Sequence, residues 1–112
     1  MPPSEPDQIT VIVKRPGERA EALVTLDDAD VYRTLIGGWL EPITVAGYPG
    51  YMDEEGKLKN ARVNFTLGGT VVVGPVIFFG GMKEGRAVGF GSVAEANAVI
   101  ALLEREGLVP PS

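Results

Sequence analysis

Two short runs of carboxylates carry the oxygen ligands that a hard cation such as Ca²⁺ or Mg²⁺ prefers. The runs are Asp27, Asp28 and Asp30, and then Asp53, Glu54 and Glu55. Neither run has the spacing of an EF-hand loop, and each stands where a helix start or a turn needs side-chain oxygen acceptors. We therefore interpret both runs as capping and turn residues and predict no metal site and no cofactor.

Three aromatic residues stand close to glycines in the first half of the chain. They are Trp39, Tyr48 and Tyr51. If they gather at one end of a hairpin, their rings form a shelf on which a base or a partner side chain can stack. The alternative is that Trp39, the single tryptophan, anchors the core behind the first helix, and the general burial of tryptophan favours that position.

Polar and basic residues supply two further candidate sites. Glu41 with Asn64 would make a polar pair inside a pocket, or Glu41 is buried and bonded to backbone N–H groups. A group of cations would bind a phosphate or a partner carboxylate, although a solvated surface explains them as well; it comprises Lys57, Lys59 and Arg62, joined by Lys14, Arg15 and Arg19. The candidate binding residues are therefore Trp39, Glu41, Tyr48, Tyr51, Arg62 and Asn64.

The chain contains no cysteine and no histidine. Without them there is no disulfide, no thiolate nucleophile, no imidazole base and no ordinary zinc site. The glycine-rich residues 80–85 lack the Gly-Lys-Ser/Thr ending of a phosphate-binding Walker loop and are expected to form a mobile hairpin loop. These absences remove most hydrolase mechanisms, and we predict a protein that is not an enzyme.

Composition and charge describe an ordinary globular domain: 45% of the residues are hydrophobic, 22% are charged, and the net charge is −5. An acidic chain is a poor non-specific ligand for duplex DNA or anionic lipid, which bind basic surfaces. The longest apolar run, residues 71–79, is interrupted by Gly74-Pro75 and is far shorter than the ~20 residues of a membrane span. Residues 1–7 are acidic and proline-rich, so we expect a flexible leader rather than a signal peptide and a soluble intracellular protein.

The first half of the chain predicts two hairpins with a short helix between them. Alternating β-branched residues indicate strands on both sides of a turn at residues 15–18. An aspartate cap and the stop at Gly37 bound a helix of about ten residues. A strand at residues 39–46, placed at an edge or a bulge by Pro42, then turns at residues 47–50 into a short return strand at Tyr51-Met52.

The second half predicts one long strand and one long helix. Residues 57–67 show no period and are expected to be an ordered connection, whereas residues 69–79 read as a buried strand at the centre of the sheet, with Gly74-Pro75 as a bulge. A short extended piece follows at residues 86–90. Ser92 begins a capping box and Gly107 ends the last helix, whose apolar stripe should lie across the sheet; the stripe is Ala96, Val99, Ile100 and Leu103.

These elements, in the order β-β-α-β-β-β-α, predict a small α+β domain with a largely antiparallel sheet. The single domain should span residues 8–109, and residues 110–112 should form a tail.

Four short motifs in fixed order resemble a family of small domains of unknown function found in bacteriophages, plasmids and bacterial genomes. The motifs are Leu35-Ile36-Gly37-Gly38-Trp39-Leu40-Glu41, Asp53-Glu54-Glu55-Gly56-Lys57-Leu58, the isolated Asn64, and Val72-Val73-Gly74-Pro75-Val76-Ile77. The resemblance covers roughly residues 9 to 105, and this chain has Asp53 where the family usually has asparagine. It implies an accessory protein of a mobile element working in a bacterial cytoplasm, and it implies no particular activity.

The function we expect is that of a non-catalytic binding protein of a phage or plasmid. It would engage a host protein or a small nucleotide-like ligand, with counter-defence as one role. The alternative is a homo-oligomeric module in which residues 71–79 or the last helix pair with a second copy. A metal-dependent or carboxylate-based enzyme using Glu41 or the two aspartate-containing runs is a third hypothesis.

Overall fold

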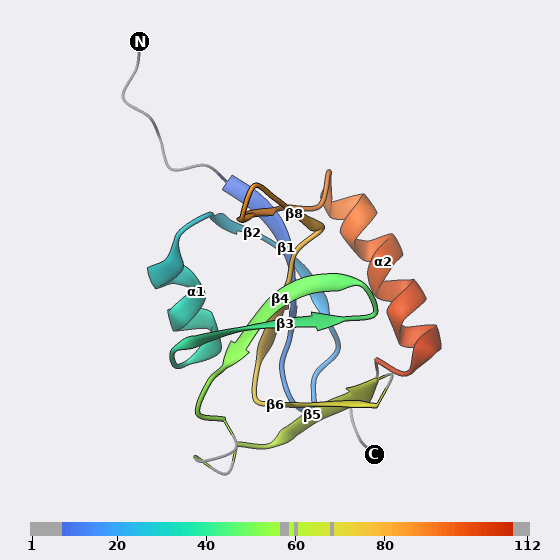
Figure 1. The fold of residues 1–112 in the computed structure, drawn as a ribbon. Helices are drawn as coiled ribbons and strands as arrows, with labels where there is room; N and C mark the ends of the chain where they lie inside the picture. Colours follow the sequence, from blue (N-terminus) through green and yellow to red (C-terminus); the bar gives the residue numbers. More distant parts are fainter. Residues whose placement is uncertain (1–7, 57–58, 60, 68, 109–112) are drawn as a thin grey trace.

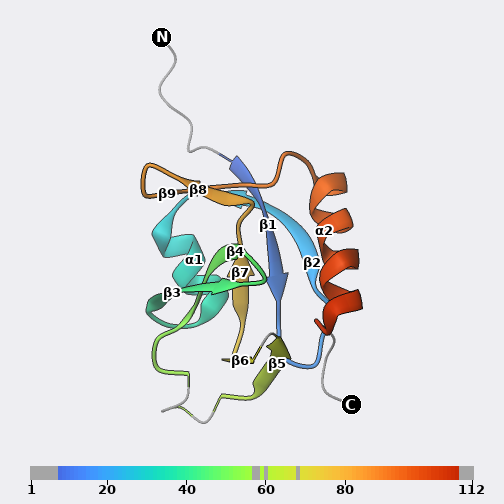
Figure 2. The same ribbon diagram turned by 45° about the vertical axis from the view of Figure 1, so that its right-hand side comes forward.

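A five-stranded sheet forms the centre of the molecule, in a computed structural model that describes residues 8–56, 59, 61–67 and 69–108. The strand order is β2-β1-β7-β4-β3, and each neighbouring pair is antiparallel. Helix α1 (Ala29–Ile36) lies on one side of the sheet and helix α2 (Val93–Glu106) on the other (Figures 1 and 2). The prediction of an α+β domain with a largely antiparallel sheet and a longer C-terminal helix is confirmed.

Alternating side chains explain why both faces of the sheet are covered. In β1 (Gln8–Lys14), Ile12 points into the core beneath α2, whereas Val11 and Val13 pack beneath α1. Strand β7 (Val76–Phe78) divides in the same way, with Phe78 beneath α2 and Ile77 beneath α1. Successive side chains of a strand point to opposite faces, so β7 is apolar throughout and β1 is apolar from Val11 to Val13.

The two hairpins predicted for the first half are present. Strand β2 (Glu21–Leu26) pairs with β1, and β3 (Leu40–Val45) pairs with β4 (Tyr48–Asp53). Strand β3 lies at the edge of the sheet, as expected from Pro42, which cannot donate to a neighbouring strand. The predicted turn at residues 47–50 is wrong, because Ala46 and Gly47 adopt positive φ and make a tight two-residue turn. The return strand therefore starts at Tyr48.

Both helices begin and end as the sequence predicts. The Asp28 carboxylate accepts hydrogen bonds from the backbone N–H groups of Asp30 and Val31, and Ser92 Oγ accepts one from Glu95 at 3.0 Å. Gly37 and Gly107 close the two helices with positive φ values of 84° and 119°. The expected stripe of α2 packs on the sheet side, with Ala96, Ile100 and Leu103 buried and Val99 partly buried.

Two small hairpins complete the described residues, and neither was fully predicted. Residues 69–79 form two strands, β6 (Thr70–Val73) and β7, because Gly74 turns the chain with a φ of 75° and sends it into a different sheet. Strand β6 pairs instead with β5 (Val63–Leu67), which lies inside the supposed connection. Only β7 takes the predicted central place in the large sheet.

The glycine-rich segment after β7 is part of a hairpin, as expected, but residues 81–83 form a strand rather than a loop. Strand β8 (Gly81–Lys83) pairs with β9 (Arg86–Val88) across a turn at Glu84 and Gly85. The expected leader, residues 1–7, and the expected tail, residues 110–112, lie outside the described residues. No helix in the part of the chain that the structure describes is long and apolar enough to cross a membrane.

Candidate functional site

Trp39 stands in the open where the chain leaves α1. Its side chain is 63% exposed, and the guanidinium carbon of Arg33 lies 5.4 Å from the centre of its ring. Arg33 also forms an ion pair with Asp30. The interpretation that Trp39 anchors the core is therefore wrong: Gly37 ends α1 in a left-handed conformation, and the indole that follows is exposed.

A shallow hollow of about 480 Å³ lies beside this ring, and we call it the Trp39 hollow. Residues from α1, from the helix exit and from the loop after β4 share its lining: Asp30, Arg33, Thr34, Gly38, Trp39, Glu55 and Lys59. It brings an aromatic face, two cations and two carboxylates together on the surface.

Asp53 fixes the loop that forms one side of this hollow. The residue is only 6% exposed, its Oδ1 accepts a hydrogen bond from the Glu55 N–H at 2.9 Å, and its Oδ2 lies 2.9 Å from the Lys59 ammonium. Burial alone would raise the pKa of Asp53, but the Glu55 hydrogen bond and the Lys59 ammonium outweigh it and hold the pKa below its usual value. The carboxylate is therefore ionised at neutral pH.

The helix exit and the loop after β4 are tied to each other directly. The Lys59 ammonium donates to the carbonyl oxygen of Gly37 at 3.3 Å, and the Glu54 N–H donates to that of Trp39 at 2.9 Å. Gly38 packs against Asp53 so closely that a Cβ there would lie 2.5 Å from Oδ1. This explains why the Gly-Gly-Trp and Asp-Glu-Glu-Gly motifs occur together, since each shapes the other.

Glu41 lies beside a second, more enclosed space of about 270 Å³, which we call the Glu41 cavity. Three of the sequence motifs contribute to its lining, which consists of Glu41, Met52, Asp53, Glu54, Gly56 and Val73. Glu41 is half-buried rather than fully buried. The cavity thus adjoins the Trp39 hollow through Asp53 and Glu54.

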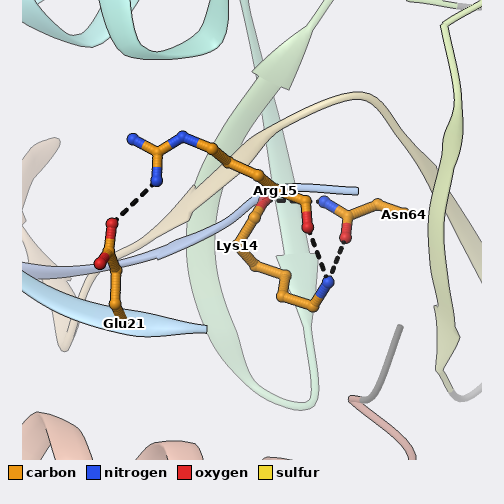
Figure 3. A network of polar contacts seen from close by, with 4 residues as sticks. All are labelled: Lys14, Arg15, Glu21 and Asn64. Atoms are coloured by element: carbon orange, nitrogen blue, oxygen red, sulfur yellow. Dashed lines mark hydrogen bonds and ion pairs between the residues drawn. The ribbon is translucent and has the colours of Figure 1, made fainter. Parts of the chain in front are cut away.

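Asn64 is fully buried, and its amide group forms hydrogen bonds with residues other than Glu41. The amide nitrogen donates to the carbonyl oxygen of Lys14 at 2.7 Å, and the amide oxygen accepts from the Lys14 ammonium at 2.8 Å (Figure 3). The amide nitrogen also donates to the carbonyl oxygen of Gly74 at 2.9 Å. The Lys14 ammonium also donates to the Arg15 carbonyl oxygen. Burial lowers the pKa of Lys14, against an opposing effect of Glu18. The expected pair of Glu41 with Asn64 is not formed.

The two tyrosines lie on opposite faces of the sheet. Tyr51 packs beneath α1, with its ring centre 5.4 Å from that of Phe79, and Tyr48 packs on the other side, 5.9 Å from Phe90. A shelf made of Trp39 and both tyrosines is therefore not present. Tyr48 instead lies beside a separate hollow of about 570 Å³ between the β8–β9 hairpin and α2.

The described cations do not form a common phosphate pocket. Arg15 pairs with Glu21 at 2.8 Å, as Figure 3 also shows, and Arg19 pairs with Glu104 at 2.9 Å. Arg62 lies over the turn between β1 and β2, where a Cβ on Gly17 would come within 2.9 Å of its guanidinium. Lys57, the remaining member of the expected group, lies outside the described residues.

The first acidic run serves the helix. Asp28 caps α1, Asp30 pairs with Arg33, and Asp27 accepts a hydrogen bond from the Tyr32 hydroxyl at 2.7 Å. Burial and this contact raise the pKa of Tyr32. Within the described ranges, no three acidic side chains are arranged to hold a metal ion.

Comparison with known families decides what kind of domain this is. Residues 9–98 match the family model described as Domain of unknown function (DUF3846). The chain belongs to this family. The resemblance to a family of small domains of unknown function is thus confirmed, while its association with phages and plasmids stays a prediction. No curated protein and no solved structure matches the chain.

Sequence reasoning missed two kinds of residue at these sites. Arg33 was overlooked as a neighbour of Trp39, although it lies in the last turn of α1. Lys14 was grouped with surface cations, although the alternation of β1 places it on the same face as the buried Ile12. That alternation is the signal that could have revealed a buried lysine.

Proposed function

We propose that this DUF3846 domain is a non-catalytic binding protein whose contact surface for a protein partner is the Trp39 hollow. The observation that carries the proposal is the exposure of the only tryptophan, at 63%, on a surface that also presents Arg33. Covering an exposed indole with a partner lowers the free energy of the system, because apolar surface leaves water. Tryptophan and arginine also contribute most of the binding energy at many protein interfaces.

The backbone around the indole supports this role because it is held in place before any partner arrives. Asp53, Lys59 and the Trp39 carbonyl link the helix exit to the loop after β4. A surface that is already ordered loses less conformational entropy on binding. The hollow therefore suits recognition better than a mobile loop would.

A protein partner is favoured over a nucleotide-like ligand by the way the charges are paired. Arg33 faces Asp30, and Lys59 faces the buried carboxylate of Asp53. A phosphate would have to compete with both carboxylates for these cations, in a hollow that also contains Glu55. The nucleotide-like ligand is kept as the outcome to be tested against.

The biological setting of the proposal comes from the family resemblance. We propose an accessory protein of a phage or plasmid that acts in the cytoplasm of a bacterial host, with interference in host defence as its role. The homo-oligomer alternative now depends on α2 or on β6, because β7 already has β1 and β4 as neighbours, whereas β6 pairs with β5 in a two-stranded sheet. A carboxylate-based enzyme would have to use Glu41 and its cavity.

The test compares two variants that each remove one exposed apolar side chain. Trp39→Ala alters the proposed surface, and Leu102→Ala alters α2, where Leu102 is 53% exposed. The immobilised wild-type protein and the Leu102→Ala variant should retain the same protein from a bacterial lysate, and the Trp39→Ala variant should lose it. Once purified, the retained lysate protein should shift the fluorescence of Trp39 to shorter wavelength when it is added to the wild-type domain.

Retention of the same proteins by all three chains would contradict the proposal. So would a nucleotide that shifts Trp39 fluorescence when no lysate protein does. Equal thermal midpoints of the variants ensure that a loss of binding is not a loss of folding.

A further inference from the structure

We infer that the partner covering the Trp39 hollow presents a basic segment, with arginine or lysine side chains directed at this surface. The inference rests on the proposed function and adds the chemistry of the partner. It follows from the charges, the aromatic ring and the cavity that the structure brings together around Asp53.

The charge around the two adjoining spaces is strongly uneven. Five carboxylates line the Trp39 hollow and the Glu41 cavity, against two cations among the described residues: the carboxylates are Asp30, Glu41, Asp53, Glu54 and Glu55, and the cations are Arg33 and Lys59. The whole chain has the same sign, with a net charge of −5. A cationic partner is attracted to such a surface, whereas a polyanion is repelled.

The ring of Trp39 adds a preference for cationic side chains over neutral ones. Arg33 already places its guanidinium 5.4 Å from the ring centre, which shows that this indole accepts a cation on its face. With 63% of the residue exposed, a partner arginine has room to reach the indole beside Glu55. Arginine can stack on the ring and pair with a carboxylate through the same planar group.

The Glu41 cavity suits the other basic side chain. Its lining combines apolar atoms of Met52 and Val73 with the carboxylates of Glu41 and Glu54. A lysine has an apolar stem and a charged head, so it can bury the first while the second meets a carboxylate. A segment with both kinds of cation would therefore occupy both spaces.

The experiment measures Trp39 fluorescence during titration with defined peptides. The probes are a blocked pentapeptide Arg-Gly-Lys-Gly-Arg, its counterpart Glu-Gly-Glu-Gly-Glu, and ATP. The basic peptide should change the fluorescence saturably and bind less well as salt is raised. The acidic peptide and ATP should leave it unchanged.

Charge-reversed variants separate the local surface from the total charge. The variant Glu54→Lys/Glu55→Lys alters two exposed residues beside the hollow, and Glu84→Lys/Glu106→Lys makes the same change in net charge at exposed positions elsewhere. The first variant should bind the basic peptide about tenfold more weakly than wild type or worse, since it places like charges opposite each other at the interface. The second should stay close to wild type.

Three results would overturn the inference: no saturable response to the basic peptide, a response to the acidic peptide or ATP, or equal peptide binding by both charge-reversed variants. Failure of the proposed function is recognised separately. If the lysate partner depends on Trp39 but binds the Glu54→Lys/Glu55→Lys variant as well as wild type, the partner surface stands and its basic character is wrong. If no protein depends on Trp39, the binding function itself is wrong.

Discussion

At the scale of single residues, the buried amide of Asn64 is held by three hydrogen bonds. It donates to two carbonyl oxygens and accepts from the Lys14 ammonium, a partner 50 residues away in the chain. Among the described residues, no buried side-chain nitrogen or oxygen lacks a hydrogen-bond partner. An amide suits this place because it is donor and acceptor at once, and it joins β5 to the end of β1 and to the corner at Gly74.

Replacing Asn64 by alanine should be strongly destabilising. The substitution removes one of the two acceptors of the Lys14 ammonium and the amide donor of two carbonyl oxygens, which should lower the free energy of unfolding by about 3 kcal/mol or more. The control is Asn97→Ala, at an exposed position of α2. Urea unfolding of both variants checks the prediction, and equal midpoints would contradict the role of Asn64.

Lys14 should make stability depend on alkaline pH. Because burial lowers its pKa in the folded protein below the ordinary 10.5, the unfolded chain binds more protons between these two values. Stability relative to the Lys14→Met variant should therefore rise as pH increases toward 10.5. Unfolding curves measured across this pH range test the prediction, with the exposed Lys83→Met variant as the control. A stability difference between wild type and Lys14→Met that falls as pH rises would contradict it.

The sequence could reveal those features of the sites that depend on neighbouring residues, but not the contacts between residues that are far apart in the chain. Asn64 was expected to pair with Glu41, and this partner was wrong because Asn64 meets Lys14 through the packing of β5 on the sheet. Trp39 was assigned to the core from the average behaviour of tryptophan. Its exposure depends on the course of the chain after Gly37 ends α1, which the residue type does not encode.

At the scale of elements, local signals were reliable and pairing partners were not. Asp28, Ser92, Gly37 and Gly107 act within a few residues of the helix ends, so the helices could be predicted. The division of residues 69–79 between two sheets depends on what lies beside each half. Strand β6 pairs with β5, and β7 pairs with β1 and β4. The partners of β7 lie far away in the chain, so no short stretch of sequence identifies them.

Two glycines offer a test of how the helix exit is held. Gly38→Ala would place a Cβ 2.5 Å from Asp53 Oδ1, whereas Gly81→Ala meets no atom within 4 Å. Gly38→Ala should destabilise the protein by about 1–3 kcal/mol and change the fluorescence of Trp39, because Asp53 must move away. Gly81→Ala should leave both unchanged. Similar thermal midpoints for the two variants would show that the contact with Asp53 does not hold the corner.

At the scale of the whole molecule, the two faces of the sheet are covered by α1 and α2 (Figure 1). Trp39, which follows the end of α1, is left exposed. The surrounding surface is acidic in a chain of net charge −5. Composition predicted the sign of that charge, and only the fold shows that it gathers beside an aromatic ring. The proposed binding function depends on this combination rather than on any catalytic group.

The most direct measurement is collisional quenching of Trp39 fluorescence by acrylamide, in the folded protein and in urea. The chain has a single tryptophan, so the signal comes from one side chain. We expect the folded protein to be quenched nearly as readily as the unfolded chain, because an open indole is the basis of the binding surface. Strong protection of Trp39 in the folded protein would contradict the account.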